Sequence, residues 1–243
     1  MLKCQFHTHS GQDPEDRIDY SEKELISKAA SLDYNVLAIT CHNKVVFNKN
    51  LRKFAEKKGI LLIPGVELTI KKTHNLILNP TEEILEVETF EDLRNYKNSH
   101  PECLIIAPHP FFPTRKALKK ELIENIDIYD AIEYSFCYTK TKNYNNEAVT
   151  LAKRWKKPII STADCHILKY LDLGFAEVNA KKSIQAIFKA IKQNRIKKPH
   201  CANLIFHNLQ DPLQNDIPNV ENLVSYKHAF LHSKNTKSGK EES

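Results

Sequence analysis

The sequence predicts a single-domain α/β protein, built as a barrel of parallel strands with helices in the crossovers. Short apolar runs alternate with longer amphipathic stretches about seven times before residue 195, as strand–helix units of a parallel sheet do. The chain has 243 residues, 41% of them hydrophobic, which is enough for one sizeable core. At this length we favour a closed barrel over an open sheet. Such a barrel can have fewer than eight strands.

The first half of the chain supplies strands separated by two capped helices. Ser21 and Glu24 offer a capping box at the start of the first helix, and Gly59 ends the second. Pro64 and Gly65 separate two adjacent apolar runs. The expected strands are 2–6, 36–40, 60–63, 66–70 and 75–78, and the expected helices are 21–32 and 50–58.

The second half repeats the pattern until it fails after Arg195. The expected strands are 103–107, 131–134, 158–161 and 175–178, and the expected helices are 90–98, 114–124, 146–155 and 183–193. Beyond Arg195 the chain mixes Pro, Asn, His and Lys. Apolar runs at 204–206 and 224–230 are candidates to pack on the barrel, and about the last ten residues should be disordered. We therefore divide the chain into a barrel, 1–195, and a partly disordered C-terminal extension, 196–243.

Composition narrows the class of protein. The net charge of +6, from 36 Lys+Arg against 30 Asp+Glu, suits anionic substrates but is too weak and dispersed for a dedicated nucleic-acid surface. Six scattered cysteines without a CxxC pair indicate free thiols in a reducing compartment. Because no apolar run approaches the roughly 20 residues of a membrane helix, we expect a cytoplasmic protein with no membrane association. Nothing in the sequence indicates its oligomeric state.

Metal-ligand residue types follow five of the apolar runs, where strands of a parallel barrel end. His7 with His9 and Asp164 with His166 are spaced i, i+2, so each pair can reach one site from one side of an extended segment. The other positions are His42, Glu67 and His109, each after a run, and His74, just before one. Since all strand C-termini open on one face of such a barrel, these imidazoles and carboxylates predict a hydrolytic metal centre there.

In the same order along the chain, five motifs resemble those of the PHP (polymerase and histidinol phosphatase) superfamily. They are the HxHS of His7 and His9, Ile39-Thr40-Cys41-His42-Asn43, Pro64-Gly65-Val66-Glu67, Pro108-His109-Pro110, and Asp164-Cys165-His166. The resemblance covers residues 1 to about 195. It implies a distorted (β/α)7 TIM-like barrel with two or three divalent metal ions and phosphoesterase activity.

The resemblance also implies a ligand set. One metal would be held by His7, His9, Glu67 and Asp164. Glu67 would bridge, as the catalytic carboxylate, to a second metal that His74 and His109 complete. A third metal would be held by His42 and His166 with an aspartate from the loop after His9.

That loop contains two candidates for the aspartate. Asp13 and Asp16 both lie near the expected place, and Asp13 is slightly preferred. The polymerase-type branch has a further histidine here, so acids without a histidine favour the phosphatase-like branch. The competing interpretation is turn chemistry, since Asp13-Pro14 is a common turn element.

Two further residues bear on how the site is tuned. Cys41 stands where many relatives have aspartate. Because His42 is retained, we expect the properties of the metal site to be altered while metal binding is kept. Arg115, in the loop after His109, is a candidate substrate-binding cation, although an ordinary helix-start arginine explains it as well.

These inferences predict a metal-dependent phosphoric ester hydrolase that uses a metal-bound hydroxide and Mn, Fe or Zn. The preferred substrate is a small phosphorylated metabolite, with a nucleotide phosphomonoester first. The alternatives are a phosphodiesterase or short-oligonucleotide exonuclease, and a PHP domain that binds metal without catalysis. An amidohydrolase-like barrel is less favoured, because no lysine stands at a suitable strand end.

Overall fold

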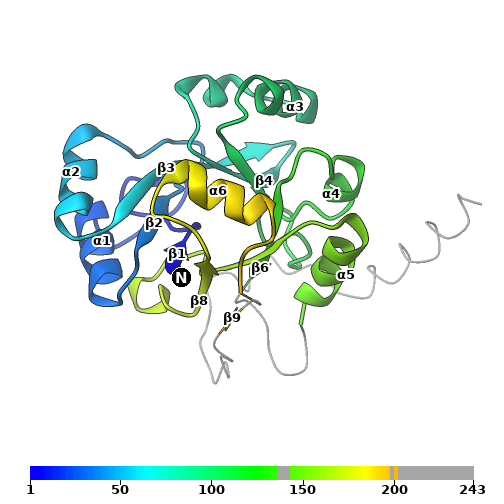
Figure 1. Ribbon diagram of the computed structural model, residues 1–243. Helices are drawn as coiled ribbons and strands as arrows, with labels where there is room; N and C mark the ends of the chain where they lie inside the picture. Colours follow the sequence, from blue (N-terminus) through cyan, green and yellow to red (C-terminus); the bar gives the residue numbers. More distant parts are fainter. Residues whose placement is uncertain (136–142, 198–199, 202–243) are drawn as a thin grey trace, which may run out of the picture. The chain divides into compact units, whose positions relative to one another are not determined.

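Nine strands form one sheet in the part of the chain that the computed structural model describes, residues 1–135, 143–197 and 200–201 (Figure 1). The described residues all belong to one compact unit, Met1–His207. The strand order is β7-β6-β5-β4-β3-β2-β1-β8-β9. The strands are β1 (Leu2–Gln5), β2 (Val36–Ile39), β3 (Leu61–Ile70), β4 (Thr73–Leu78), β5 (Leu104–Ala107), β6 (Ala131–Ser135), β7 (Ile159–Thr162), β8 (Gly174–Val178) and β9 (His200–Cys201).

The sheet closes almost completely into a barrel. Just beyond β1 and β7, Thr8 pairs in parallel with Cys165. The main-chain N–H of His9 donates to the carbonyl of Cys165 at 3.1 Å, and that of Cys165 donates to the carbonyl of His7 at 3.3 Å. These bonds join segments about 155 positions apart in sequence and confirm the predicted distorted TIM-like barrel.

Two strands run against the direction expected of them. β4 is antiparallel to β3 and β5, and β8 is antiparallel to β1. The β3–β4 connection consists of Lys71 and Lys72, which both have positive φ, 48° and 69°, as a tight two-residue hairpin turn requires. Asparagine and glycine usually signal such a turn, so two lysines gave no sequence signal. The all-parallel prediction is therefore wrong for β4 and β8.

The predicted runs 60–63 and 66–70 form one strand, β3, with Gly65 inside it. A Cβ at Gly65 would lie 2.7 Å from Thr40 Cγ2 and 3.2 Å from the carbonyl oxygen of Ile39. Only glycine allows β3 to pass this close to the end of β2. Glu67, two residues later, is thereby placed beside the end of β2.

Six α-helices surround the strands in the described residues (Figure 1). The capping box of Ser21 and Glu24 is confirmed, and Gly59, with φ of 76°, follows the second helix. The predicted helix 114–124 is wrong in its first half, because Lys119 has φ of 48° and interrupts it. The helices are α1 (Glu22–Ser31), α2 (Lys49–Lys57), α3 (Phe90–Ser99), α4 (Lys120–Glu124), α5 (Asn145–Trp155) and α6 (Ile184–Lys192), with 3₁₀ turns η1 (Glu82–Glu86) and η2 (Leu168–Tyr170).

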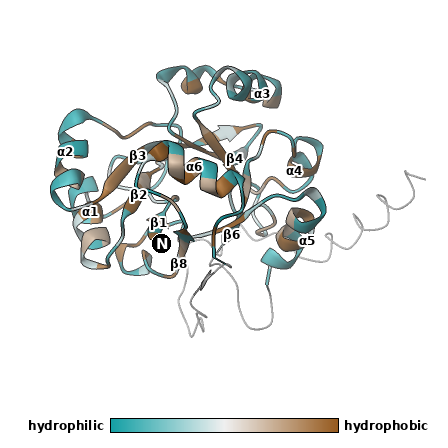
Figure 2. Cartoon of the chain, viewed as in Figure 1, coloured by the Kyte–Doolittle hydropathy of each residue, from teal (hydrophilic) through white to brown (hydrophobic). Residues whose placement is uncertain are grey.

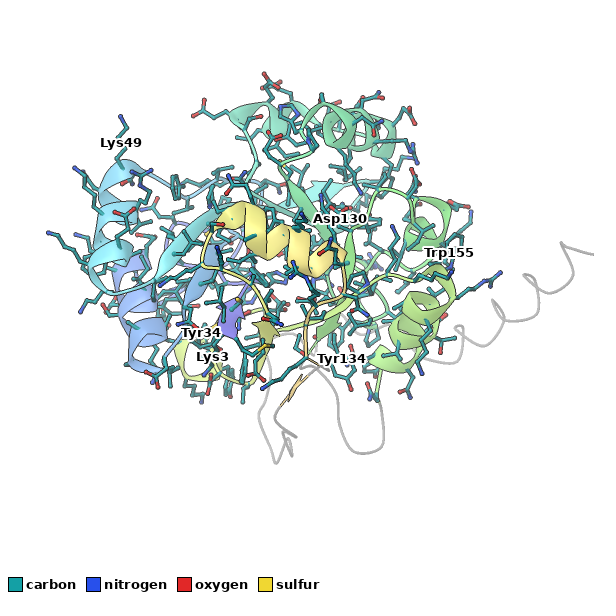
Figure 3. The ribbon with its side chains drawn as sticks, viewed as in Figure 1. Lys3, Tyr34, Lys49, Asp130, Tyr134 and Trp155 are labelled. Carbon is teal, nitrogen blue, oxygen red and sulfur yellow. The ribbon has the colours of Figure 1, made fainter. Side chains whose placement is uncertain are left out.

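The core has an inner and an outer layer. In β2, Val36 and Ala38 pack in the inner cluster, whereas Leu37 and Ile39 pack outward beneath α1 and α2. Figure 2 shows much of the strand ribbon as brown and the outer helix faces largely as teal, and Figure 3 shows Lys49 pointing away from the barrel. The apolar face of α6 joins the inner cluster through Ile187 and other residues.

The chain continues along the sheet beyond residue 195. Ile196 pairs with Val178, and β9 pairs with β8. The predicted apolar runs 204–206 and 224–230 and the predicted disordered end lie outside the described residues, so the division at 195 stays a prediction. Among the described helices, none is both long and apolar enough to cross a membrane.

Candidate metal centre

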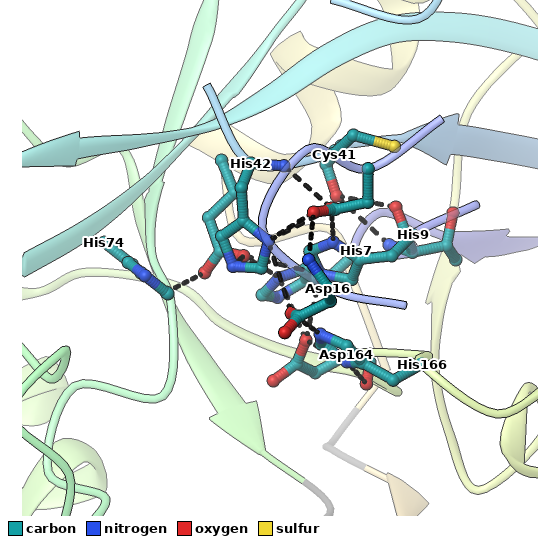
Figure 4. A network of polar contacts seen from close by, with 12 residues as sticks. His7, His9, Asp16, Cys41, His42, His74, Asp164 and His166 are labelled. Atoms are coloured by element: carbon teal, nitrogen blue, oxygen red, sulfur yellow. Dashed lines mark hydrogen bonds and ion pairs between the residues drawn. The ribbon is translucent and has the colours of Figure 1, made fainter. Parts of the chain in front are cut away.

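The ligand-type side chains predicted from the sequence converge at the barrel end where the parallel strands terminate (Figure 4). Most of these side chains are buried, whereas His166 and Asp16 are partly exposed. His74 belongs with them because β4 is antiparallel, so that its start lies at the same end as the C-termini of its neighbours. The residues brought together are His7, His9, Asp13, Asp16, His42, Glu67, His74, His109, Asp164 and His166.

Hydrogen bonds beyond the formal strand ends hold this edge in place. The Thr8 hydroxyl donates to the carbonyl of Ala38 at 2.7 Å, which ties the segment after β1 to β2. The main-chain N–H of Glu67 donates to the carbonyl of Cys41 at 3.2 Å, and that of Asn43 donates to the carbonyl of Glu67 at 2.9 Å. The HxHS segment, His42 and Glu67 are thus fixed as one continuous piece of sheet.

Glu67 lies at the middle of the cluster, and its two carboxylate oxygens face different imidazoles. Oε2 faces the histidines that follow β1 and β2, and Oε1 faces the histidine on β4 and the one that follows β5. The distances from Oε2 are 3.1 Å to His7 Nε2, 3.4 Å to His9 Nε2 and 3.2 Å to His42 Nε2, and those from Oε1 are 2.8 Å to His74 Nδ1 and 3.1 Å to His109 Nε2. One carboxylate therefore stands between two groups of imidazoles, as a bridging ligand would.

The side chains form several overlapping groups, in each of which the potential ligand atoms lie within 4.8 Å of one another. Two of the groups share Glu67, and three share His42. The groups are His7, His9, Glu67 and Asp164; Glu67, His74 and His109; His9, His42 and His166; Asp13, Asp16 and His42; and Glu15, His42 and His74. The first two match the ligand sets expected for two metals joined by Glu67.

Several buried atoms of the cluster have no hydrogen-bond partner. They are Nε2 of His7, Nε2 of His9, both ring nitrogens of His74, Nδ1 of His109 and Oδ1 of Asp164. Although His74 Nδ1 lies 2.8 Å from Glu67, that contact lacks hydrogen-bond geometry. Burying an unpaired polar atom costs about 1–3 kcal/mol, and these atoms are nitrogen and oxygen donors of the kind that divalent metals bind. The residues present therefore fit a divalent metal centre.

The two loop aspartates occupy different places. Asp13 Oδ2 lies 2.8 Å from His9 Nδ1 and 3.0 Å from His42 Nδ1, and it accepts the main-chain N–H of His42 at 2.9 Å. Asp16 Oδ2 lies 2.9 Å from His166 Nε2 and 3.5 Å from His42 Nδ1. Asp16 is therefore the aspartate that faces both His42 and His166, whereas Asp13 faces His9 and His42.

The carboxylates change the proton affinities of the histidines. Burial alone would lower the pKa of His42, but hydrogen bonds with Asp13 and Glu67 raise it to about 10. Burial likewise opposes the charged form of His166, yet the charge of Asp164 and the bond with Asp16 raise its pKa to about 9. A divalent cation that binds here must displace these protons.

The pKa values of two members of the cluster are lowered. Burial lowers the pKa of His74, which keeps its imidazole neutral near pH 7. Burial would raise the pKa of Glu67, but the neighbouring histidines His74 and His7 hold it well below its ordinary value. A neutral imidazole and an ionised carboxylate are the forms that ligate metals.

Sequence reasoning missed two residues of this region. Glu133 on β6 contacts His7. It lies inside an apolar strand run, and a single charged residue in such a run is the signal that could have identified it. Lys116 Nζ lies 3.0 Å from Glu15 Oε2, and Glu15 belongs to one of the ligand groups. Arg115, the predicted substrate-binding cation, is exposed next to Lys116, and its role in substrate binding stays a prediction.

Cys41 does not join the ligand groups of the described residues. Its sulfur lies 3.5 Å from the Ser10 hydroxyl and points away from the cluster in Figure 4. Burial raises the pKa of this thiol to about 11, so it stays protonated near neutral pH.

Comparison with known proteins relates the chain to others through structure alone. No protein-family model and no curated protein matches it. One similar structure is a two-domain protein of Bacteroides vulgatus, described as containing a predicted PHP-like metal-dependent phosphoesterase. The two are 22% identical with a TM-score of 0.63, over 80% of this chain and 63% of the other.

Two more solved structures have the same architecture. The lesion-specific endonuclease Q of Pyrococcus furiosus is 18% identical with a TM-score of 0.59, over 79% of this chain and 56% of the endonuclease. A putative metal-dependent phosphoesterase of Bifidobacterium adolescentis is 13% identical with a TM-score of 0.56, over 68% and 87% of the two chains. The chain thus spans less than two thirds of the first and second of these structures. It has the fold of the PHP-like metal-dependent phosphoesterases.

Proposed function

We propose that this protein is a divalent-metal-dependent phosphoesterase. The observation that carries the proposal is the pair of ligand groups that share Glu67 and contain buried atoms without hydrogen-bond partners. The similar fold of phosphoesterases supports it. When bound, divalent ions at this site would lower the pKa of water toward neutrality and neutralise charge on the phosphoryl oxygens.

The residues have separate roles in the proposed centre. Glu67 bridges the two sites and fixes their separation, because its oxygens face opposite groups of imidazoles. His7, His9 and Asp164 complete one site, and His74 and His109 complete the other. His42 and His166 form a third site, for which we propose Asp16 as the carboxylate because it faces both.

Among the cations of the described residues, Lys116 is the one to which we assign substrate phosphate. Its ammonium pairs with Glu15, whose carboxylate lies within reach of the ring nitrogens of His42 and His74. An arriving phosphate would compete with Glu15 for this partly exposed lysine.

A nucleotide phosphomonoester is our preferred substrate. Phe112 follows His109 by three residues, and its N–H donates to the His109 carbonyl at 3.0 Å. Its ring meets Tyr144 edge to face at 5.6 Å, and both rings are partly exposed. Aromatic surface beside a phosphate-binding centre suits a nucleobase, since bases stack on aromatic rings.

A phosphodiesterase or short-oligonucleotide exonuclease is the second candidate. Endonuclease Q, which has a similar fold, has been solved with a 27-mer duplex substrate carrying an abasic lesion at its active site. A nucleic acid is therefore an alternative substrate to a free nucleotide. The third candidate is a domain that binds metals without turnover.

Metal content and turnover separate these candidates. The full chain is stripped with chelator, reconstituted with Mn²⁺, Fe²⁺ or Zn²⁺, and its bound metal is counted by inductively coupled plasma spectrometry. We expect at least two equivalents for the native chain and fewer for His109→Asn. His100→Asn, which alters a histidine stacked on Tyr96 outside the cluster, is the matched control and should bind as the native chain does.

The reconstituted protein is then assayed with nucleotide monophosphates, p-nitrophenyl phosphate and its bis-ester. Monoester turnover supports the preferred function, and turnover of the diester alone supports the phosphodiesterase. Full metal content without turnover of any phosphoester would identify a non-catalytic domain. Fewer than two metal equivalents in the native chain would overturn the multinuclear centre itself.

A further inference from the structure

Glu133 is a buried carboxylate that belongs to none of the ligand groups described above. It lies on β6 between Ile132 and Tyr134, and its side chain is 0% exposed. Burying a carboxylate is costly unless its oxygens are hydrogen-bonded and its charge is balanced. Among the contacts that the described residues make with Glu133, none comes from lysine or arginine.

The contacts of Glu133 all lead toward the candidate metal centre. Oε1 lies 2.9 Å from His7 Nδ1 and accepts the hydroxyl of Thr162, at the end of β7. Oε2 accepts the main-chain N–H of His109. One carboxylate thus holds the ring of a ligand in the first Glu67 group and the backbone of a ligand in the second.

The geometry at His7 determines what this contact does. With Nδ1 against Glu133, the opposite nitrogen Nε2 points into the cluster, 3.1 Å from Glu67 Oε2 and 3.2 Å from Asp164 Oδ1. Since an ionised carboxylate can only accept a hydrogen bond, Glu133 selects the tautomer in which Nδ1 carries the proton and Nε2 has a free lone pair. The unpaired Nε2 is then ready to bind a metal ion.

The geometry at His109 adds a second effect. His109 has φ of 27°, in the left-handed region that residues other than glycine seldom adopt. The bond from its main-chain N–H to Glu133 helps to hold this backbone and so directs the imidazole toward Glu67, 3.1 Å away.

We propose that Glu133 is a positioning residue that orients His7 and His109 for metal binding and raises the affinity of the Glu67-bridged sites. The inference rests on the proposed function, because it requires that those sites bind divalent metal. A divalent cation bound by His7 would balance the negative charge of Glu133 through the imidazole ring. Loss of such a partner of a ligating histidine commonly weakens metal binding by about 10–100-fold.

The test compares Glu133→Gln with Asp130→Asn. Asp130 precedes the same strand and also receives a main-chain N–H, that of Ile105 at 3.0 Å, but it lies beside α6 (Figure 3), where Lys192 is 3.9 Å away. Affinity for Zn²⁺ and Mn²⁺ is measured on the full chain by competition with a chromophoric chelator, and thermal unfolding of the metal-free form is followed alongside. We expect E133Q to bind about 10–100-fold more weakly than the native chain, and D130N to bind within about twofold.

The outcomes distinguish failure of the positioning role from failure of the proposed function. Native affinity in folded E133Q would overturn the positioning role while leaving the proposed function standing. If E133Q does not fold, Thr162→Val, which removes a donor to the same carboxylate, takes its place. A severalfold loss of metal affinity in T162V supports the inference, and native affinity overturns it. Failure of the native chain to bind metal would overturn both.

Discussion

Asp16 and His166 meet at the mouth of the barrel, where Asp16 Oδ2 lies 2.9 Å from His166 Nε2 across 150 positions of sequence. The same oxygen lies 3.5 Å from His42 Nδ1. We therefore expect Asp16→Asn to lose about one metal equivalent and to keep the Glu67-bridged pair. Asp13→Asn should instead weaken more than one site, because Asp13 contacts both His9 and His42. Metal counts after equilibrium dialysis check this, and a clean loss of one equivalent in D13N alone would assign the third site to Asp13.

Lys116 should matter for substrate binding, and its neighbour should not. Removing the ammonium that pairs with Glu15 takes away a charge at the mouth of the site, so Lys116→Ala should raise KM for a phosphomonoester about tenfold, or about 1.4 kcal/mol. Arg115→Ala, which alters an exposed residue next in sequence, should leave KM near its native value. Steady-state kinetics at fixed metal concentration measures both, and equal effects would count against Lys116 as the phosphate contact.

Substitution of Phe112 tests whether the site binds a nucleobase. If the ring stacks on a nucleobase, Phe112→Ala should raise KM for a nucleoside monophosphate about tenfold, since such stacking contributes about 1–3 kcal/mol. KM for ribose 5-phosphate, which has the phosphate and sugar but no base, should change little. The ratio of the two effects is the measurement, and a ratio of one would remove the argument for a nucleotide.

Gly65 packs closely against the end of β2 and lies two residues before Glu67 of the candidate metal centre. Gly65→Ala places a Cβ against Thr40 and the backbone of Ile39, so it should cost about 1–3 kcal/mol of unfolding free energy and displace Glu67. Gly59→Ala has open space around the new Cβ and bears only the strain of φ 76°, so it should cost about 1 kcal/mol. Urea unfolding and metal titration together check this. Metal affinity should fall in G65A only.

The metal-free protein should lose stability as pH rises. The folded pKa values of His42 and His166 are raised to about 10 and about 9, above the value of about 6.5 for an unfolded histidine. Stability from these protonated histidines is fully present below about pH 6.5 and is lost as pH rises through 9 to 10. Urea unfolding of the metal-free chain from pH 6 to 10 measures it. His42→Gln should flatten the profile, and an unchanged slope would contradict this account.

The sequence predicted those parts of the fold and site that depend on local pattern. Ser21 with Glu24 marked a helix start because the capping box is a contact across one turn. The i, i+2 spacing of His7 and His9 placed both rings on one side because an extended backbone alternates its side chains. Their convergence with Glu67 followed from the rule that parallel strands end on one face.

What escaped prediction depends on contacts between distant segments. Lys71 and Lys72 adopt left-handed conformations that their side chains do not favour, and the pairing of β3 with β4 imposes them. Glu133 is a lone acid in an apolar strand, and its partners come from β7 and from the segments that follow β1 and β5. We propose Asp16 in place of Asp13 because Asp16 faces His166, a contact that only the closed barrel determines.

The hairpin of β3 and β4 has one more consequence. Glu67 and His74 stand on adjacent strands of one ribbon, in which Glu67 pairs with Leu76 and His74 with Thr69. The spacing between the Glu67 carboxylate and the His74 imidazole is therefore set by the pairing of the two strands and is independent of loop length. Inserting one residue within either strand would turn one of the two side chains to the opposite face. A longer turn that preserves the pairing would leave both in place, which makes this hairpin the natural segment to transplant when a two-metal site is designed into another barrel.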